Sequence, residues 1–192
     1  MTKQKTGKLF IISGPSGSGK STILKQVLKN MPEIYFSVSV TTRPPRPGEA
    51  HGAHYHFISQ GEFDQLAEAD GLLEYARYVG NSYGTPAEPI RARLDAGVDV
   101  LLDIEVQGAE QIKDKMPEAV TIFLSPPSLE VLEARLRARG TDSEEKILHR
   151  LETAKEELTH VERYDYLVIN DTIAQAVQEV ETIVKSEGGQ SR

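Results

Sequence analysis

The sequence predicts an α/β fold in which a mainly parallel sheet is covered by helices on both faces. Short runs that are apolar along their whole length alternate with segments whose apolar residues recur at helical spacing. Strands separated by helices are joined by crossover connections, which make neighbouring strands parallel, and strands buried on both faces are apolar throughout. The chain of 192 residues is long enough for one domain that carries inserted subdomains.

Composition and charge exclude several classes of protein. There is no cysteine, which rules out a disulfide scaffold, a thiolate zinc site and a cysteine nucleophile. The 22 lysines and arginines against 29 aspartates and glutamates give a net charge of −7, so we expect no binding to nucleic acid or to an anionic membrane. No apolar run approaches the roughly 18–20 residues of a membrane span, and Met1–Gly7 lacks the apolar centre of a secretory signal. We therefore expect a cytoplasmic protein.

The first elements are predicted to be a strand, a glycine-rich loop and a helix. Lys8–Ser13 is a short apolar run, and the apolar residues of Ser21–Asn30 recur at helical spacing. Pro32 prevents this helix from continuing. Ile34–Val40 is rich in β-branched and aromatic residues and predicts a second strand.

The region that follows differs in composition from its flanks. Arg43–Glu49 holds three prolines, which fix the backbone and remove hydrogen-bond donors, so we expect a rigid loop that carries two arginines. Ala53–Ile58 and Leu72–Tyr78 predict short strands on either side of a helix that Ser59 can cap. Residues 42–85 are therefore expected to form an inserted subdomain.

Regular alternation returns after the insert. The expected elements are helices over residues 86–96, 106–115, 128–139, 142–160 and 172–185, and strands over residues 98–104, 120–125 and 166–170. Gly14, Asp103 and Asn170 all fall at the ends of predicted strands. Because open parallel sheets bind their ligands beyond the carboxyl ends of the strands, we expect these three residues to meet at the site.

A phosphate-binding loop is the most specific local signal. Gly14–Ser21 reads GPSGSGKS and matches G-x-x-x-x-G-K-[ST] between a predicted strand and a predicted helix. Its glycines let backbone amides turn towards an oxyanion, and Lys20 brings a mobile charge to the β- and γ-phosphates. Ser21 offers a hydroxyl to Mg²⁺, and Asp103 is placed as an acid on the metal side. A nucleoside triphosphate is the expected ligand.

The acceptor of a phosphoryl group is expected to lie in the insert. GTP-switch proteins need an N-K-x-D signature, and no asparagine of this sequence is followed by lysine, so a small kinase is favoured. Arg43 and Arg46 flank a proline pair that can hold two guanidinium groups for bidentate contact with a phosphate. Tyr55 and Tyr83 add hydroxyl donors.

Further segments extend this pattern along the chain. They are GPSGSGKST, FSVSVTTRPPRPGE, the run Gly52–Phe57, LLEYARYVGNSYGT, LLDIEVQGA, and RLRARG followed by Arg150. In their order and spacing, from about Leu9 to Lys185, the sequence resembles the guanylate kinases, a family of P-loop nucleoside monophosphate kinases. The resemblance implies transfer of a phosphoryl group from Mg·ATP to GMP, with dGMP as a second acceptor, giving ADP and GDP.

The resemblance also implies a division of the chain and a role for each matching residue. The P-loop core would comprise residues 1–41, 86–126 and 156–192, the GMP-binding subdomain residues 42–85, and a helical lid residues 127–155. ATP would contact Gly14, Pro15, Ser16, Gly17, Ser18, Gly19, Lys20, Ser21, Thr22, Arg135, Asn170 and Asp171. The GMP site would contain Ser39, Arg43, Arg46, Tyr55, Glu74, Tyr83, Thr85 and Asp103. Ser21 and Asp103 would bind Mg²⁺, and the catalytic residues would be Lys20, Arg46, Arg139 and Arg150.

Within the implied GMP site, the two arginines and two tyrosines would bind the phosphate, while Ser39, Glu74 and Thr85 would read the base. A fixed carboxylate at Glu74 can accept hydrogen bonds from N1–H and the 2-amino group of guanine. Adenine has neither donor and would leave the carboxylate unpaired, at a cost of about 1–3 kcal/mol.

Catalysis in such a kinase can consist of alignment and charge neutralisation, because the acceptor is already a phosphate oxyanion. Arg135 and Arg139 are four residues apart and share one helix face, and Arg150 approaches from the next helix. A lid that brings these arginines to the phosphoryl group only after both substrates bind would exclude water and suppress ATP hydrolysis.

Two other functions stay open from the sequence. One is a guanylate-kinase-like interaction module that has lost its chemistry, although such a module would not need Lys20 or Asp103. The other is a related kinase with a different phosphorylated acceptor, against which Glu74 and Ser39 argue. The oligomeric state is left open.

The three histidines at positions 51, 54 and 56 carry no metal prediction, because a metal site usually needs further ligands and supporting contacts.

Overall fold

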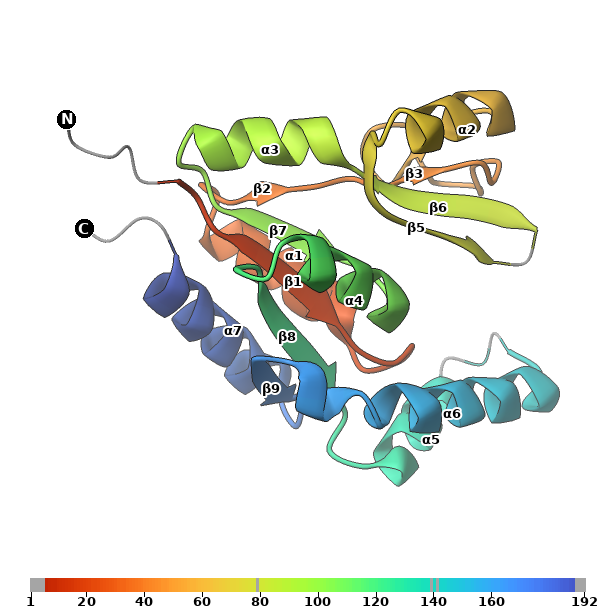
Figure 1. The fold of residues 1–192 in the computed structure, drawn as a ribbon. Coiled ribbons are helices and arrows are strands. Elements are labelled where there is room, and N and C mark those ends of the chain that lie inside the picture. Colours follow the sequence, from red (N-terminus) through yellow and green to blue (C-terminus); the bar gives the residue numbers. More distant parts are fainter. Residues whose placement is uncertain (1–5, 79, 139, 141, 189–192) are drawn as a thin grey trace.

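A parallel sheet forms the centre of the molecule in the computed structural model, which describes residues 6–78, 80–138, 140 and 142–188. Within these residues, five strands run in the order β2-β7-β1-β8-β9, and every neighbouring pair is parallel (Figure 1). The strands are β1 (Leu9–Ser13), β2 (Tyr35–Phe36), β7 (Val100–Asp103), β8 (Val120–Ser125) and β9 (Tyr166–Ile169). The predicted α/β class and parallel sheet are confirmed.

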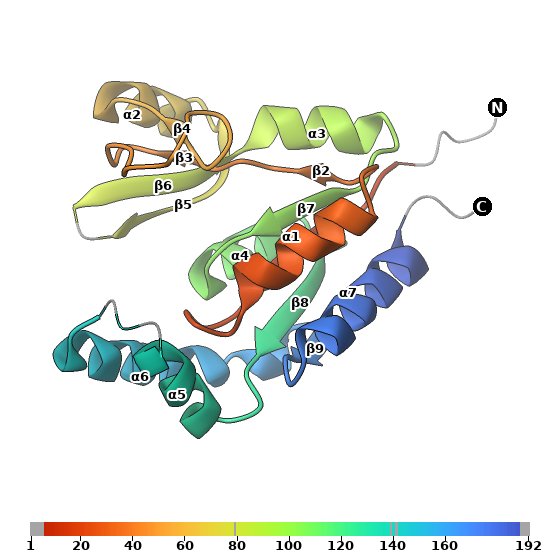
Figure 2. The same ribbon diagram turned by 180° about the vertical axis from the view of Figure 1, so that it is seen from behind.

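Helices cover both faces of this sheet. The helices are α1 (Lys20–Asn30) and α7 (Ile173–Glu187) on one face, and α3 (Ala87–Asp95) and α4 (Val106–Lys115) on the other. Side chains of β1 alternate between the two resulting cores: Phe10 and Ile12 pack with α1 and α7, while Leu9 and Ile11 pack with α3 and α4. Figure 2 shows α1 in front of the sheet, on the side opposite α4.

A second sheet extends from one side of the core. Its strands are β3 (Val40–Thr41), β4 (His56–Phe57), β5 (Leu72–Tyr78) and β6 (Asn81–Pro86), in the order β4-β3-β6-β5. Helix α2 (Gln60–Glu68) packs on it through Phe63, against Val40 and Leu72. The predicted cap of α2 is present: the Ser59 hydroxyl accepts from Glu62 N, and the Glu62 carboxylate accepts from Ser59 N at 2.7 Å.

Two details of the strand prediction are wrong in this region. The single strand expected over 34–40 is divided between the two sheets, because Phe36 pairs with Leu101 whereas Val40 pairs with Gly84. A run of β-branched and aromatic residues does not show where a chain passes from one sheet to the next. Strand β6 was not predicted, because its sequence NSYGTP has the composition of a turn. It is a strand because it pairs with both β5 and β3.

The strand expected over 53–58 is also shorter, since only His56–Phe57 forms β4. Gly52 N donates to Tyr55 O at 2.8 Å, so the preceding residues form a turn.

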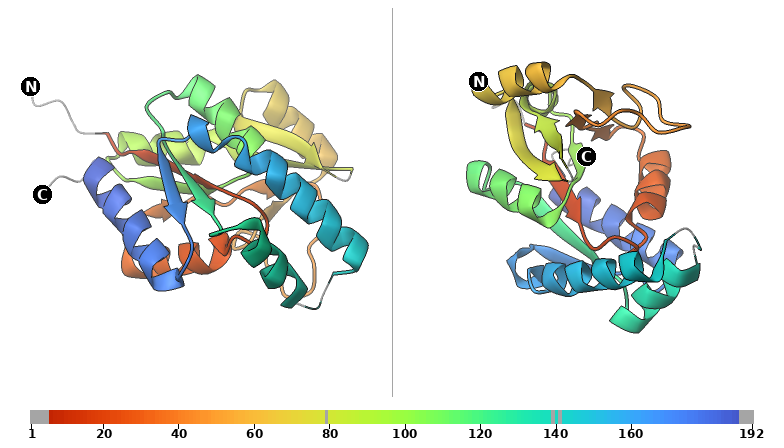
Figure 3. Two further views of the ribbon diagram at one scale, coloured as in Figure 1. Left: turned by 90° about the horizontal axis from the view of Figure 1, so that it is seen from below. Right: turned by 90° about the vertical axis from the view of Figure 1, so that its right-hand side faces the viewer.

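Helices α5 (Leu129–Ala138) and α6 (Glu144–Leu158) form a separate hairpin. Leu132 and Leu136 of α5 pack against Ile147, Leu151 and Ala154 of α6 in a small core of their own. The hairpin and the second sheet lie on opposite sides of the end of β1 (Figures 1 and 3). A short helix, η1 (Val161–Arg163), leads from α6 to β9. In the part of the chain that the structure describes, no helix combines the length and apolar character needed to cross a membrane.

A substitution in the interior strand β8 tests how much the core contributes to stability. Ile122 is fully buried, so Ile122→Ala is expected to lower the free energy of unfolding by about 2–5 kcal/mol, through lost burial and the cavity left behind. Ile173→Ala, at a position 41% exposed, serves as the control and should cost about 1 kcal/mol or less. Urea unfolding followed by circular dichroism measures both, and equal losses would contradict this description of the core.

Candidate active site

The phosphate-binding loop follows β1 and ends where α1 begins. Gly14, Gly17 and Gly19 have φ values of 150°, 99° and 95°. A Cβ at Gly14 would lie 2.1 Å from the Leu124 carbonyl oxygen, and one at Gly19 would lie 2.3 Å from Asn170 Nδ2. Gly19 is also the N-cap of α1 and has no side chain to accept from the first amides of the helix. The loop thus presents the amino end of a helix to an anion.

Lys20 and Asp103 lie together beside this loop. Lys20 Nζ donates to Gly14 O at 2.8 Å and lies 3.7 Å from Asp103 Oδ1. Burial raises the pKa of Asp103, and the neighbouring Lys20 charge opposes that rise. Asp103 ends β7, the neighbour of β1, with Ile12 paired opposite it. The expected meeting of strand ends at the site is therefore observed for Asp103.

Asn170 also contacts the loop, through a hydrogen bond from its side chain to the loop backbone. It is 2% exposed, and its Nδ2 donates to Ser18 O at 2.6 Å. The backbone carbonyl oxygen of Asn170 accepts from Arg135 Nη2 of α5 at 2.9 Å. The other terminal nitrogen of Arg135 is buried and has no hydrogen-bond partner among the described residues. Asp171 is exposed at the same edge.

The α5–α6 hairpin contacts the loop at two further points. A Cβ at Gly17 would lie 2.9 Å from side-chain carbons of Leu132 and Leu136, so α5 packs directly against the loop. Arg150 Nη1 of α6 donates to Ser16 Oγ at 3.3 Å and lies 3.4 Å from Asp142 Oδ2. Arg135 and Arg150 are thus brought to the phosphate-binding loop, whereas Arg139 lies outside the described residues.

The proline-rich loop holds its arginines through an acid that the sequence analysis missed. Both oxygens of Glu49 accept from the Arg43 guanidinium at 2.9 Å, and Glu49 Oε2 also accepts from Arg46 N at 2.7 Å. These bonds lower the pKa of Glu49 to about 2. The signal available in the sequence was an acid a few residues after two arginines in a rigid loop. The Arg46 side chain is exposed.

Two tyrosines complete this cluster. The Arg43 guanidinium lies over the Tyr55 ring, 5.4 Å from its centroid, and the Tyr55 and Tyr83 rings meet edge to face at 6.0 Å. Burial raises the pKa of Tyr55, with smaller contributions from Tyr83, Asp103 and Glu105. Arg43, Tyr55 and Tyr83, which the sequence analysis grouped at one site, therefore lie together in the structure.

Glu74 and Thr85 pair across the second sheet. They are opposite one another on β5 and β6, and Thr85 Oγ1 donates to Glu74 Oε1 at 2.5 Å. Both residues are buried, and burial raises the pKa of Glu74, against the bond from Thr85. Ser39 lies between β2 and β3, where its carbonyl oxygen accepts from His56 N at 2.8 Å. A carboxylate is therefore held inside the insert, in contact with a hydroxyl.

Two more acids, Glu105 after β7 and Glu157 in α6, were missed by the sequence analysis. Glu105 follows Asp103 by two residues, a spacing that could have indicated its place at the same edge of the sheet. Burial raises the pKa of Glu157 in α6 to about 7, and the nearby Glu105 carboxylate adds to this rise. The end of α6 is therefore electrostatically coupled to the residues that follow β7.

The histidines of the insert are used locally. His51 Nδ1 accepts from Phe57 N and His54 Nδ1 accepts from Ala50 N, each at 3.2 Å. Over the described residues, no group of three or more histidine and acidic side chains is placed to hold a metal ion.

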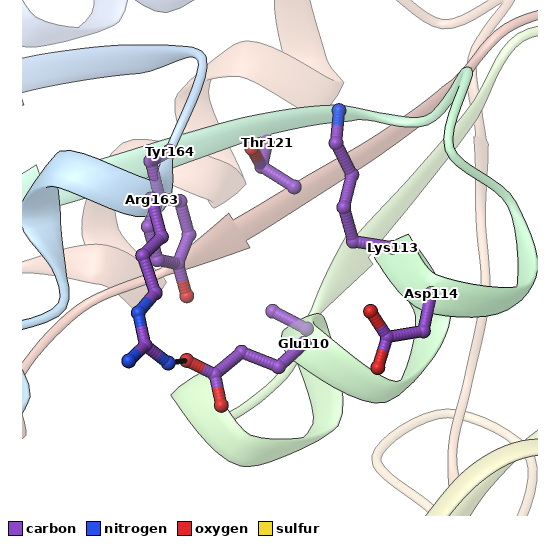
Figure 4. A pocket seen from close by; sticks show the side chains of 7 residues that line it. Glu110, Lys113, Asp114, Thr121, Arg163 and Tyr164 are labelled. Carbon is purple, nitrogen blue, oxygen red and sulfur yellow. Dashed lines mark hydrogen bonds and ion pairs between the residues drawn. The ribbon is translucent and has the colours of Figure 1, made fainter.

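A separate hollow of about 230 Å³ lies beside α4 and η1 (Figure 4). It is lined by Ala109, Glu110, Lys113, Asp114, Thr121, Arg163 and Tyr164. Glu110 pairs with Arg163 at 2.5 Å and with His160 at 2.8 Å, and Lys113 pairs with Asp165 at 2.8 Å. None of the lining residues belongs to the phosphate-binding loop, and these charges satisfy one another.

Comparisons with known proteins agree with this geometry. The family model for guanylate kinase matches residues 6–187. Guanylate kinase of Synechococcus sp. (strain JA-3-3Ab) is 53% identical over 178 residues, which are 93% of this chain and 82% of the relative. Guanylate kinase of Gloeobacter violaceus is 52% identical over 94% of this chain and 88% of the relative. The crystal structure of guanylate kinase from Anaplasma phagocytophilum has a TM-score of 0.77 and 34% identity, covering 96% of this chain and 87% of that structure.

The sequence resemblance, the two-sheet architecture and the matches along nearly the whole chain agree, and this chain belongs to the guanylate kinase family.

Proposed function

We propose that this chain transfers the γ-phosphoryl group of ATP to GMP, and also to dGMP, giving ADP and GDP. The observation that carries the choice of acceptor is the buried Glu74 carboxylate, held by Thr85 in a subdomain that also presents an arginine pair. A carboxylate and a hydroxyl fit the donors of a guanine edge, and the arginines fit a phosphate.

The phosphate-binding loop would bind the triphosphate of ATP. Three features of the loop fit this anion: glycines at positive φ, the uncapped first turn of α1, and the buried Arg135 nitrogen that lacks a partner among the described residues. Lys20 would exchange its bond to Gly14 O for phosphate oxygens. Asn170 would act by holding the loop through Ser18, and Asp171 would lie on the adenine side.

Ser21 and Asp103 would hold Mg²⁺ together with the phosphates of ATP. A hydroxyl and a carboxylate are hard oxygen donors of the kind that Mg²⁺ prefers, and Asp103 already lies beside Lys20 at the end of β7. When bound, the metal ion would neutralise charge on the triphosphate.

The acceptor phosphate would be held by Arg43, Arg46, Tyr55 and Tyr83. Glu49 keeps the Arg43 guanidinium in place, so a phosphate would meet an oriented group. Arg46 is exposed and can turn towards the transferred group. Ser39 would complete the base site with Glu74 and Thr85.

Residues 127–155 would act as a lid over the core (1–41, 86–126 and 156–192), with the GMP-binding subdomain over 42–85. Arg135 and Arg150 already contact the edge of the donor site, and Arg139 would join them. These cations would neutralise the charge of the transferring phosphoryl group, and closure would exclude water.

A coupled assay of ADP formation with GMP, AMP, CMP and UMP as acceptors tests the proposal directly. GMP should be preferred by orders of magnitude. Transfer to another nucleotide in preference to GMP would refute the acceptor, and ATP binding without transfer to any of the four would indicate an interaction module.

Lys20 is expected to be essential for turnover but not for the fold. Lys20→Ala should lower kcat by about two orders of magnitude or more, because the charge acts on phosphate rather than on the core. Lys25→Ala, at an exposed position of the same helix, is the matched control. Steady-state kinetics with thermal unfolding measure both, and near-normal turnover of Lys20→Ala would contradict the assigned role.

Glu74 should control the use of GMP. Glu74→Gln is expected to raise KM for GMP by about one to two orders of magnitude while KM for ATP is kept, because the amide turns donors towards guanine donors. Since burial raises the pKa of Glu74, acid should weaken GMP binding at a higher pH than for an ordinary glutamate of pKa about 4.3.

GMP binding is expected to weaken as the pH falls, because protonation removes the negative charge with which Glu74 accepts hydrogen bonds from guanine. The phosphate of GMP titrates in both proteins, so the difference between the pH profiles of KM for wild type and Glu74→Gln isolates the carboxylate. Identical profiles, or an equal loss for GMP and ATP, would contradict its role as the reader of the base.

Glu49 is expected to act on the acceptor phosphate through Arg43. Glu49→Gln should raise KM for GMP about fivefold or more with little change in KM for ATP, because one charge-assisted bond and the orientation of Arg43 are lost. The exposed Glu33→Gln is the control and should match wild type. Unchanged KM for GMP in Glu49→Gln would show that Arg43 needs no such support.

A further inference from the structure

Helix α4 is attached to β5 along one of its faces. The side-chain amide of Gln111 donates to Tyr75 O and accepts from Tyr75 N, each at 3.3 Å. One turn further on, Lys115 Nζ donates to Leu72 O at 3.5 Å. Residues three and four apart share a helix face, so Gly108, three residues before Gln111, lies on this same face. The register of α4 on β5 is thereby fixed.

At Gly108 this face meets the Glu74 carboxylate. A Cβ on Gly108 would lie 2.7 Å from Glu74 Oε2 and 3.0 Å from Glu74 Cδ, so a side chain at this position would force the carboxylate to shift. Oε1 of the same carboxylate accepts from Thr85 Oγ1. Glu74 therefore cannot move away from α4 without losing the Thr85 bond or its burial. The carboxylate occupies the volume that a side chain at residue 108 would fill.

Glycine at position 108 is unfavourable for the stability of helix α4. Glycine is a poor helix former, so alanine at this position would stabilise α4 if there were room for it. Gly61 in the first turn of α2 is the instructive contrast, because a Cβ there would meet no atom within 4 Å. The two helical glycines differ in whether a carboxylate lies against them.

We infer that Gly108 is a specificity-determining positioning residue for recognition of the base. By lacking a side chain, it admits the Glu74 carboxylate to the place that Thr85 sets, and so fixes the oxygen atoms presented to the guanine edge. This inference rests on the proposed function of Glu74. Gly108 acts through Glu74 and contacts no substrate itself.

Gly108→Ala tests the inference, with Gly61→Ala as the matched glycine-to-alanine control. The Gly108 variant should raise KM for GMP about tenfold or more, with kcat and KM for ATP within about twofold of wild type. Its preference for GMP over IMP should also fall, because IMP keeps N1–H but lacks the 2-amino group. A purely structural defect would lower the use of both nucleotides equally. Kinetics of Gly108→Ala that match those of Gly61→Ala would overturn the inference.

A second variant tests whether the effect runs through Glu74. Aspartate is shorter by one methylene and withdraws the carboxylate from residue 108. Glu74→Asp should therefore cost less GMP affinity in the Gly108→Ala background than in wild type. Additive losses would mean that the two residues act independently, and the inference would fail.

Should Gly108→Ala fail to fold, Glu74→Ala in the same chain should restore folding, because it removes the clashing carboxylate. Circular dichroism and thermal unfolding measure this, and a double variant that stays unfolded would overturn the inference. Glu74→Gln distinguishes a failure of the proposed function of Glu74 from a failure of the role of Gly108. If Glu74→Gln leaves KM for GMP unchanged, the proposed function of Glu74 fails; if it raises KM while Gly108→Ala does not, only the role of Gly108 fails.

Discussion

The tight turn between β1 and α1 shapes the loop around which the other candidate site residues gather. Positive φ at Gly14 and Gly19 turns the loop between β1 and α1, and both positions lack room for a side chain. The Leu124 carbonyl of β8 occupies the space that a Cβ at Gly14 would need, and the Asn170 side-chain amide after β9 does the same at Gly19. Three strands of the sheet therefore shape the loop, and its geometry does not belong to the loop sequence alone.

Most cations of the candidate site have partners within the protein. Lys20 bonds to Gly14 O, Arg43 is held by Glu49, and Arg150 contacts Ser16 and Asp142. These contacts hold the three cations in defined positions at the edges of the candidate site. Asp103 differs from these cations, since burial raises its pKa and so disfavours its charged form, while the Lys20 charge opposes that rise.

Helix α4 connects the two halves of the molecule. Its start follows Asp103 and Glu105, the acids at the end of the core sheet, and its Gly108–Lys115 face lies along β5 of the second sheet. The helix that follows Asp103 therefore also limits where the Glu74 carboxylate can lie. A displacement of α4 would move the residues after β7 and the neighbours of Glu74 together.

The fold class, the phosphate-binding loop and most of the helices could be predicted from the amino-acid sequence alone. Each of these is encoded locally, by hydrophobic period, by glycine spacing or by a cap such as Ser59. The sequence suggested Arg43, Tyr55 and Tyr83 as ligands of one phosphate, and the family resemblance supported this grouping, although nothing in their spacing brings them together.

Four features are visible only in the folded chain: the passage between two sheets after Phe36, the existence of β6, the bonds of Glu49 to Arg43 and the contact of Gly108 with Glu74. These features depend on pairs of residues from different elements. Their energies arise from pairing, burial and excluded volume in space, which a one-dimensional pattern does not contain.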